Sequence, residues 1–177
     1  MRKMYLFEIY LGIGYLSLIF VSYFYLNMRL EEEIRQKQFK SAFEKGLVNF
    51  IYTYNWVDAQ MKEFFKSFDL TNQQYNVLRI LRGQHPTPAT INLLRERMLD
   101  KMSDASRIVE RLRLKDLLER HTSEYDRRSV DICITEEGLA LLGKIDVLMD
   151  RHQCEIFKNL TVEEVEQLNI LFDKLRG

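Results

Sequence analysis

The spacing of apolar residues divides the chain into an uncharged opening and a longer helical part. Residues 9–28 (IYLGIGYLSLIFVSYFYLNM) are twenty in a row without a charge, which is long enough for a helix to cross a bilayer. From Leu30 to Phe68, apolar residues recur every three or four positions. This period predicts a long amphipathic helix, either continuous or broken.

Two short helices are predicted after this segment. Thr71 and Gln74 have the spacing of a capping box, and the helix that they begin should end near Gly83. The segment HPTPAT at residues 85–90 then forces a turn through its two prolines. Its last residue, Thr90, is expected to cap the second helix.

A third short helix is predicted over DASRIVERLRLKDL at residues 104–117, with Ser103 as its cap. The spacing of the apolar positions then changes from about three and a half residues to two. LLERHT at residues 117–122 and VDICIT at residues 130–135 are expected to be strands, joined by the polar turn SEYDRRS at residues 123–129. The pattern therefore predicts a β-hairpin directly after three helices.

Helical periodicity resumes after the hairpin and continues to the C-terminus. Residues 136–160 predict one helix, and Thr161 with Glu164 forms a second capping box that begins the last one. This last helix carries an apolar stripe but has little of its own chain to pack against. The C-terminal helices are therefore expected to be incompletely buried in a single chain.

Composition and charge narrow the class of protein. The chain is 46% hydrophobic and 29% charged, an ordinary globular balance, and its net charge is zero. Between Arg79 and Arg128, however, twelve Arg and Lys face eight Asp and Glu, a local excess of +4. Such segregation allows one region to attract phosphates although the total is neutral.

Catalytic and metal chemistry find no support in the sequence. There is no Gly-rich phosphate loop and no HExxH motif, and the only cysteines, Cys133 and Cys154, lack zinc-site or disulfide spacing. His152, Cys154 and Glu155 do not share one helical face, so no metal site is expected there. We therefore predict a protein that is not an enzyme and that needs no cofactor.

The N-terminal run has three interpretations. A membrane anchor would be flanked by Arg2 and Lys3 and followed by further basic residues, which places the bulk of the chain in the cytoplasm. A mis-assigned start is the second, because Met28 opens a charged, helix-forming sequence. The third is a helix buried in a dimer.

Three helices followed by a hairpin form the order of a winged helix-turn-helix, whose reading helix enters the major groove of DNA. Four segments, LTNQQYNVLRIL, RIVERLRLKDLLER, DRRSVDICITEEG and LTVEEVEQLNILFDKL, together resemble the MarR family of bacterial transcription regulators. The resemblance spans about Ile34 to Arg176. Its most specific part is the wing pattern of Asp126, Arg127, Thr135 and Gly138.

The resemblance implies a mainly α fold with a small β-hairpin, in which the N- and C-terminal helices intertwine in a homodimer that binds a palindromic operator in double-stranded DNA. The expected organisation is an apolar extension at 1–28, an N-terminal dimerisation region at 29–69, the DNA-binding domain at 70–136 and dimerisation helices at 137–177. The function implied is a sequence-specific cytoplasmic regulator, a repressor released by a small molecule. The alternatives are a membrane-tethered regulator and a winged-helix module that binds protein.

Candidate DNA contacts lie at the start of the reading helix and at the hairpin tip. The first group is Lys101, Ser103, Asp104, Ser106 and Arg107. Arg107 either pairs with a guanine edge or contacts phosphate, and Thr90 is expected at a phosphate. By resemblance, Asp126 braces the wing through one arginine while the other approaches a minor groove, and the sequence does not assign Arg127 and Arg128 between these roles.

The aromatic residues Tyr52, Tyr54, Trp56 and Tyr75 are candidates for an effector pocket. The family resemblance implies a small aromatic ligand where the dimer helices meet the reading head. An aromatic stripe at helical spacing is also typical of plain core, and both interpretations remain open.

Overall fold

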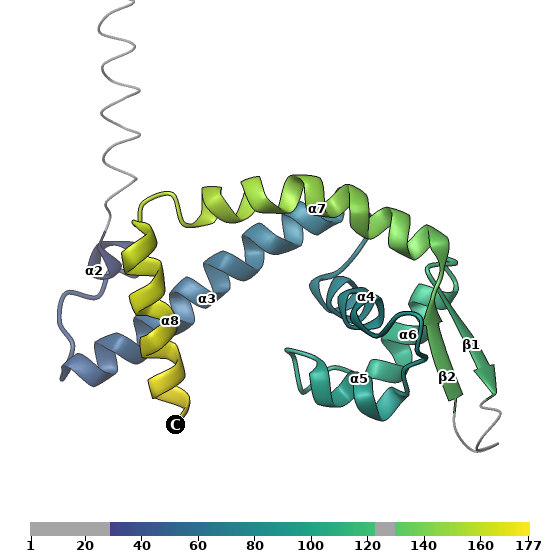
Figure 1. Ribbon diagram of the computed structural model, residues 1–177. Coiled ribbons are helices and arrows are strands. Elements are labelled where there is room, and N and C mark those ends of the chain that lie inside the picture. Colours follow the sequence, from purple (N-terminus) through teal and green to yellow (C-terminus); the bar gives the residue numbers. More distant parts are fainter. Residues whose placement is uncertain (1–28, 123–129) are drawn as a thin grey trace, which may run out of the picture. The chain divides into compact units, whose positions relative to one another are not determined.

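A computed structural model describes residues 29–122 and 130–177. Within them the chain forms seven helices and two strands (Figure 1): α2 (Leu30–Glu33), α3 (Ala42–Lys66), α4 (Asn72–Gln84), α5 (Ile91–Arg97), α6 (Ala105–Arg113), β1 (Leu118–Thr122), β2 (Val130–Ile134), α7 (Glu136–Ile156) and α8 (Val162–Arg176). None of the helices in these residues is both long and apolar enough to cross a membrane. The apolar run at 9–28 lies outside them.

The chain divides into two compact units, Met1–Asn55 and Trp56–Gly177, and the boundary falls within α3. In the first unit the predicted N-terminal helix is broken, because Arg35 adopts a positive φ of 55° after α2. The ammonium of Lys45 then reaches Glu31 at 2.5 Å, and the hydroxyl of Tyr52 donates to Glu33 at 2.9 Å. These contacts fasten α2 to the N-terminal half of α3.

The second unit holds the main hydrophobic core. Residues from α4, α5, α6, the hairpin and α7 meet there, and its fully buried members include Val77, Leu78, Leu94, Val109, Leu112, Ile132, Leu142 and Ile145. Each helix contributes one apolar face at the three-to-four spacing seen in the sequence. The core therefore fixes the three short helices and the hairpin to one another.

The two strands pair antiparallel, from Leu118 opposite Ile134 to Thr122 opposite Val130. Ile132 is also paired with Ala89, which follows the two prolines: each amide donates to the other's carbonyl oxygen at 2.9 Å. The prolines thus end α4 and deliver a short extended segment to the open edge of β2. The predicted hairpin is confirmed, and its tip at 123–129 lies outside the described residues.

The junction between β2 and α7 explains why this part of the wing pattern needs Thr and Gly. The hydroxyl of Thr135 donates to the carbonyl oxygen of Asp116 at 2.7 Å and accepts the Gly138 amide at 3.1 Å, so that Thr135 caps α7. A Cβ on Gly138 would stand 2.3 Å from the carbonyl oxygen of Leu117. Only glycine allows α7 to start this close to β1.

The predicted caps at Thr71, Thr90 and Thr161 are confirmed, the first and last as complete capping boxes. The prediction that Ser103 caps the third helix is wrong. Asp104 has the extended backbone of a cap and accepts the Arg107 amide at 3.1 Å, while the hydroxyl of Ser103 donates to Asp100 at 2.7 Å. The third helix also ends at Arg113, because Asp116 turns the chain with a φ of 57°.

Candidate nucleic-acid interface

Helix α6 presents a sharply divided surface. Ala105, Val109 and Leu112 lie against the core and are fully buried. The opposite side is exposed and carries Ser106, Arg107, Arg111 and Arg113. The spacing of the buried residues forces the arginines outward, because positions three and four apart share a face of a helix. The outer face of α6 is therefore rich in arginine, with Glu110 as its one acidic residue.

Arg107 is less constrained than Arg113, which is paired with Glu110. Its backbone amide is used by the Asp104 cap, but its guanidinium has no hydrogen bond or ion pair within residues 29–122 and 130–177. A free, exposed guanidinium one turn into a helix can form two parallel hydrogen bonds with a guanine edge or one charged contact with phosphate. The structure leaves both options available to it.

The other predicted contacts near this helix have different local roles. Lys101 is exposed, and its ammonium donates to the Glu96 carbonyl oxygen at 2.5 Å. Asp104 uses its carboxylate for the helix cap, and Ser103 uses its hydroxyl on Asp100. At α5 the hydroxyl of Thr90 accepts the Leu93 amide at 3.2 Å. Ser106 stays exposed on the outer face of α6.

Glu110 connects the cationic helix to the hairpin. Its carboxylate accepts from Arg113 at 2.8 Å and from Arg120 on β1 at 3.2 Å. These contacts hold the pKa of Glu110 below its ordinary value, with the hydrogen bond from Arg113 as the main cause. The sequence gives a signal for the first pair, three residues apart on one helix, and none for Arg120. The base of the wing is thereby tied to α6, while Asp126, Arg127 and Arg128 lie outside the described residues.

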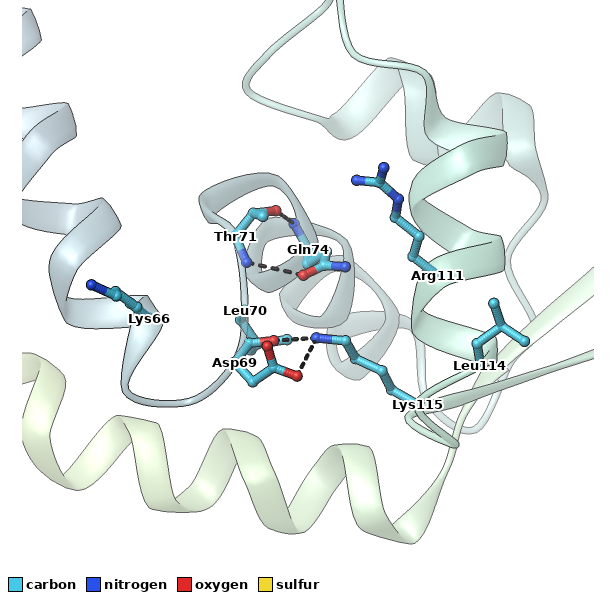
Figure 2. Close-up of a pocket in the computed structure, with 8 residues that line it drawn as sticks. All are labelled: Lys66, Asp69, Leu70, Thr71, Gln74, Arg111, Leu114 and Lys115. Atoms are coloured by element: carbon cyan, nitrogen blue, oxygen red, sulfur yellow. Dashed lines mark hydrogen bonds and ion pairs between the residues drawn. The ribbon is translucent and has the colours of Figure 1, made fainter.

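A cavity of about 470 Å³ lies at the C-terminal end of α6 (Figure 2). Its lining is Lys66, Asp69, Leu70, Thr71, Gln74, Arg111, Leu114 and Lys115. The ammonium of Lys115 contacts the carboxylate of Asp69 at 2.8 Å and also donates to its carbonyl oxygen. Figure 2 shows Arg111 of α6 and Leu114, which follows α6, across from the Thr71–Gln74 capping box. Sequence reasoning missed this cavity, because Asp69 and Lys115 are 46 positions apart.

None of the four aromatic candidates for an effector site lines that cavity. Tyr52 is hydrogen-bonded to Glu33 in the first unit, and Tyr54 and Trp56 are exposed. Tyr75 packs on Phe65 with 4.3 Å between ring centroids and accepts a hydrogen bond from Arg79 at 2.9 Å. The pocket predicted from these residues stays a prediction.

No cluster of three metal-ligating side chains occurs in the part of the chain that the structure describes. His152, considered above as a ligand, stacks on Phe64 with ring centroids 4.4 Å apart. Cys154 is free and exposed, and Cys133 is free and half-buried.

Comparison with known proteins places the fold. A sequence profile described as the MarR family matches residues 68–129. The HTH-type transcriptional regulator PapX of Escherichia coli is 25% identical over 119 residues, which are 67% of this chain and 73% of PapX. A MarR transcription factor from Planctomyces limnophilus is 28% identical with a TM-score of 0.61, covering 77% of this chain and 98% of that one. Mutant MarR from E. coli, solved with operator DNA, is 24% identical with a TM-score of 0.67, covering 85% of this chain and 100% of that one.

Proposed function

Because this chain belongs to the MarR family of winged helix-turn-helix regulators, we propose that it binds an operator in double-stranded DNA and regulates transcription as a dimeric repressor. The observation that carries this is the outer face of α6, where Arg107, without a partner in residues 29–122 and 130–177, stands among further exposed arginines on a helix whose other face is fully buried. A structural relative was solved with operator DNA. We assign α6 as the helix that enters the major groove.

The contacts divide by chemistry. Arg107 and Ser106 face outward near the start of α6 and are our candidates for base edges, with Lys101 at the phosphate backbone. Arg127 and Arg128 would act from the wing in a minor groove, braced by Asp126. Thr90, Ser103 and Asp104 support these contacts chiefly by capping α5 and fixing the turn before α6.

We propose that residues 29–69 and 137–177 form the dimer interface of this regulator, with 70–136 as the DNA-binding domain. Support comes from large apolar side chains that a single chain leaves in solvent on α7 and α8: Val147, Leu148, Val162, Ile170, Leu171 and Leu175. A dimer would bury such a surface, and contiguous exposed apolar residues commonly mark an interface.

Release by a small-molecule effector is part of the proposal. The cavity at the end of α6 supports it, because an occupant would touch Arg111 on the reading helix and Leu114, the residue that follows it. A ligand can shift the protein between DNA-binding and released states only by binding one of them more tightly. Residues on the reading helix offer the contacts for such a difference.

The proposed location is the cytoplasm, where the operator is, and no catalytic activity is proposed. A membrane-tethered form of the same regulator remains the second candidate, because residues 9–28 are uncharged for twenty positions. Full-length protein that stays with membranes through a high-salt wash would favour it. An interaction module that binds protein is the third.

The test measures binding of the full-length chain to its own upstream DNA and to a scrambled duplex across a range of salt concentrations. Specific binding should weaken steeply with salt. Arg107→Ala should cost about 1–3 kcal/mol and relax sequence preference if Arg107 reads a base, or lower the salt slope by about one if it contacts phosphate. Arg79→Ala, which removes an exposed arginine from α4, is the control and should change neither. Equally weak binding to both duplexes by a folded dimer would instead establish the interaction module.

A further inference from the structure

The turn between α5 and α6 holds two large apolar side chains in solvent. Leu99 is 86% exposed and Met102 is 93% exposed, although Met98 and Ala105 on either side of them are buried to 1% and 0%. The turn is therefore anchored in the core at both ends while its middle faces outward. The two exposed side chains contribute almost nothing to the core of their own chain.

Side chains from α4 fix the backbone of this turn. The Asn76 side-chain oxygen accepts the Leu99 amide at 3.0 Å, and Gln73 donates to the Asp100 carboxylate at 3.4 Å. The same carboxylate accepts the Met102 amide at 3.0 Å and the Ser103 hydroxyl at 2.7 Å. Because Asp100 is held from both directions, the exposure of Met102 follows from a defined backbone and not from a frayed end.

The position of Met102 determines what it can meet. It stands two residues before Asp104, the cap of α6, so it belongs to the end of the reading helix that approaches base edges. The apolar feature in the major groove is the C5-methyl group of thymine. A methionine suits this group, since its thioether chain is flexible and polarisable and adapts to a small apolar contact.

The charges beside Met102 favour DNA over a protein as its partner. Lys101 precedes it, and Arg107, whose guanidinium has no partner within the described residues, follows on the exposed face of α6. The carboxylates of Asp100 and Asp104 also flank Met102, but both already accept hydrogen bonds from the turn and the start of α6. Two apolar side chains among charged groups are too small a patch for the centre of a protein interface, which is typically depleted of charge. A polyanion that carries isolated methyl groups matches both features.

We propose that Met102 contacts the methyl group of one thymine in each half-site and thereby selects thymine at that position. The inference rests on the proposed function and adds a specificity-determining residue that the DNA-contact predictions did not include. Asp100, Gln73 and Asn76 are positioning residues in this account, because they act on the base only through the turn that carries Met102.

The experiment uses the full-length chain and a duplex selected by it from a pool of random 30-bp DNA. Each thymine of one half-site is replaced in turn by deoxyuridine, which removes only the methyl group. For the wild type, one replacement should weaken binding about four-fold, the value of burying one such group. In Met102→Ala that difference should vanish, whereas Met102→Leu should keep it.

Leu99→Ala is the matched control, because Leu99 is also an exposed apolar residue of the same turn but lies further from the start of α6. It should show the same thymine-to-deoxyuridine difference as the wild type. If Met102→Ala still binds the thymine duplex more tightly than the deoxyuridine duplex, by the same factor as the wild type, the inference is overturned while the proposed function stands. If no duplex is enriched over the random pool, the proposed function fails and the inference fails with it.

Discussion

Replacing Gly138 with alanine should destabilise the protein although the residue lies in a helix, where alanine is normally favoured. An added Cβ would lie 2.3 Å from the carbonyl oxygen of Leu117 and 2.7 Å from Cγ1 of Ile134. The first atom belongs to the backbone that leads into β1 and cannot rotate away. The start of α7 therefore has to move away from the hairpin by about 1 Å to reach ordinary contact.

The structure gives the components of the cost. Moving α7 strains or breaks the hydrogen bonds from the Thr135 hydroxyl to Asp116 and from the Thr135 amide to Leu117, at 2.7 and 3.3 Å. Each such bond contributes about 1 kcal/mol net, and an overpacked site costs about 1–3 kcal/mol. The gain in helix propensity returns about 1 kcal/mol. The expected net loss is about 2–4 kcal/mol of unfolding free energy.

Urea unfolding followed by circular dichroism measures this loss, and Gly143→Ala is the matched control. Gly143 lies in the same helix with nothing within 4 Å of the position of an added Cβ. That variant should be more stable than the wild type by up to about 1 kcal/mol. Equal stability changes in the two variants would refute the reasoning, because they would show that the contact with Leu117 imposes no constraint.

Two further predictions concern the turn before α6. Asp104→Ala should lower the unfolding free energy by about 1 kcal/mol through loss of the cap. Ser103→Ala should lower the unfolding free energy by less in the same urea experiment. The reverse order would contradict the assignment of Asp104 as the cap. The pKa of Asp100 is held below its ordinary value of 3.8, chiefly by the Ser103 hydroxyl and then by the Met102 amide and Gln73. The ionised Asp100 therefore contributes fully to stability above pH 3.8, and this contribution is lost as the pH falls through the lowered folded-state pKa. Asp100→Asn should abolish this part of the acid dependence of the unfolding free energy. An unchanged acid profile in that variant would count against this role of Asp100.

Prediction from sequence succeeded where a feature depends on neighbours along the chain. The capping boxes at Thr71 and Thr161 and the cap at Thr90 follow from residues three positions apart, and each is present. Ser103 failed for an equally local reason, because the adjacent Asp104 is as good a cap. What decides between them is Asp100, which engages the Ser103 hydroxyl in the turn. Sequence rules rank residue types at a cap, but two suitable residues in a row leave the register open.

The contacts that the sequence does not predict join segments that are distant along the chain. Arg120 reaches Glu110 across the boundary between α6 and the hairpin, and Asp69 reaches Lys115 beside the cavity. No spacing rule links such pairs, because the fold and not the chain sets their distance. The constraint on Gly138 is of this kind as well, since it comes from the carbonyl oxygen of Leu117, the residue directly before β1.

The apolar and polar periods by themselves determined the order of helices and strands, and with it the winged helix-turn-helix, because the burial of one face specifies each element locally. The same periods also place the arginines of α6 on its exposed face. Tertiary packing decided the path of the turn before α6, because Asn76 and Gln73 on α4 hold its backbone and Asp100 from a distant part of the chain. Asp104 and Ser103 stand beside Arg107 in the sequence, yet both are held by hydrogen bonds within the protein, whereas Met102 is released into solvent by a turn whose other residues hold it in place.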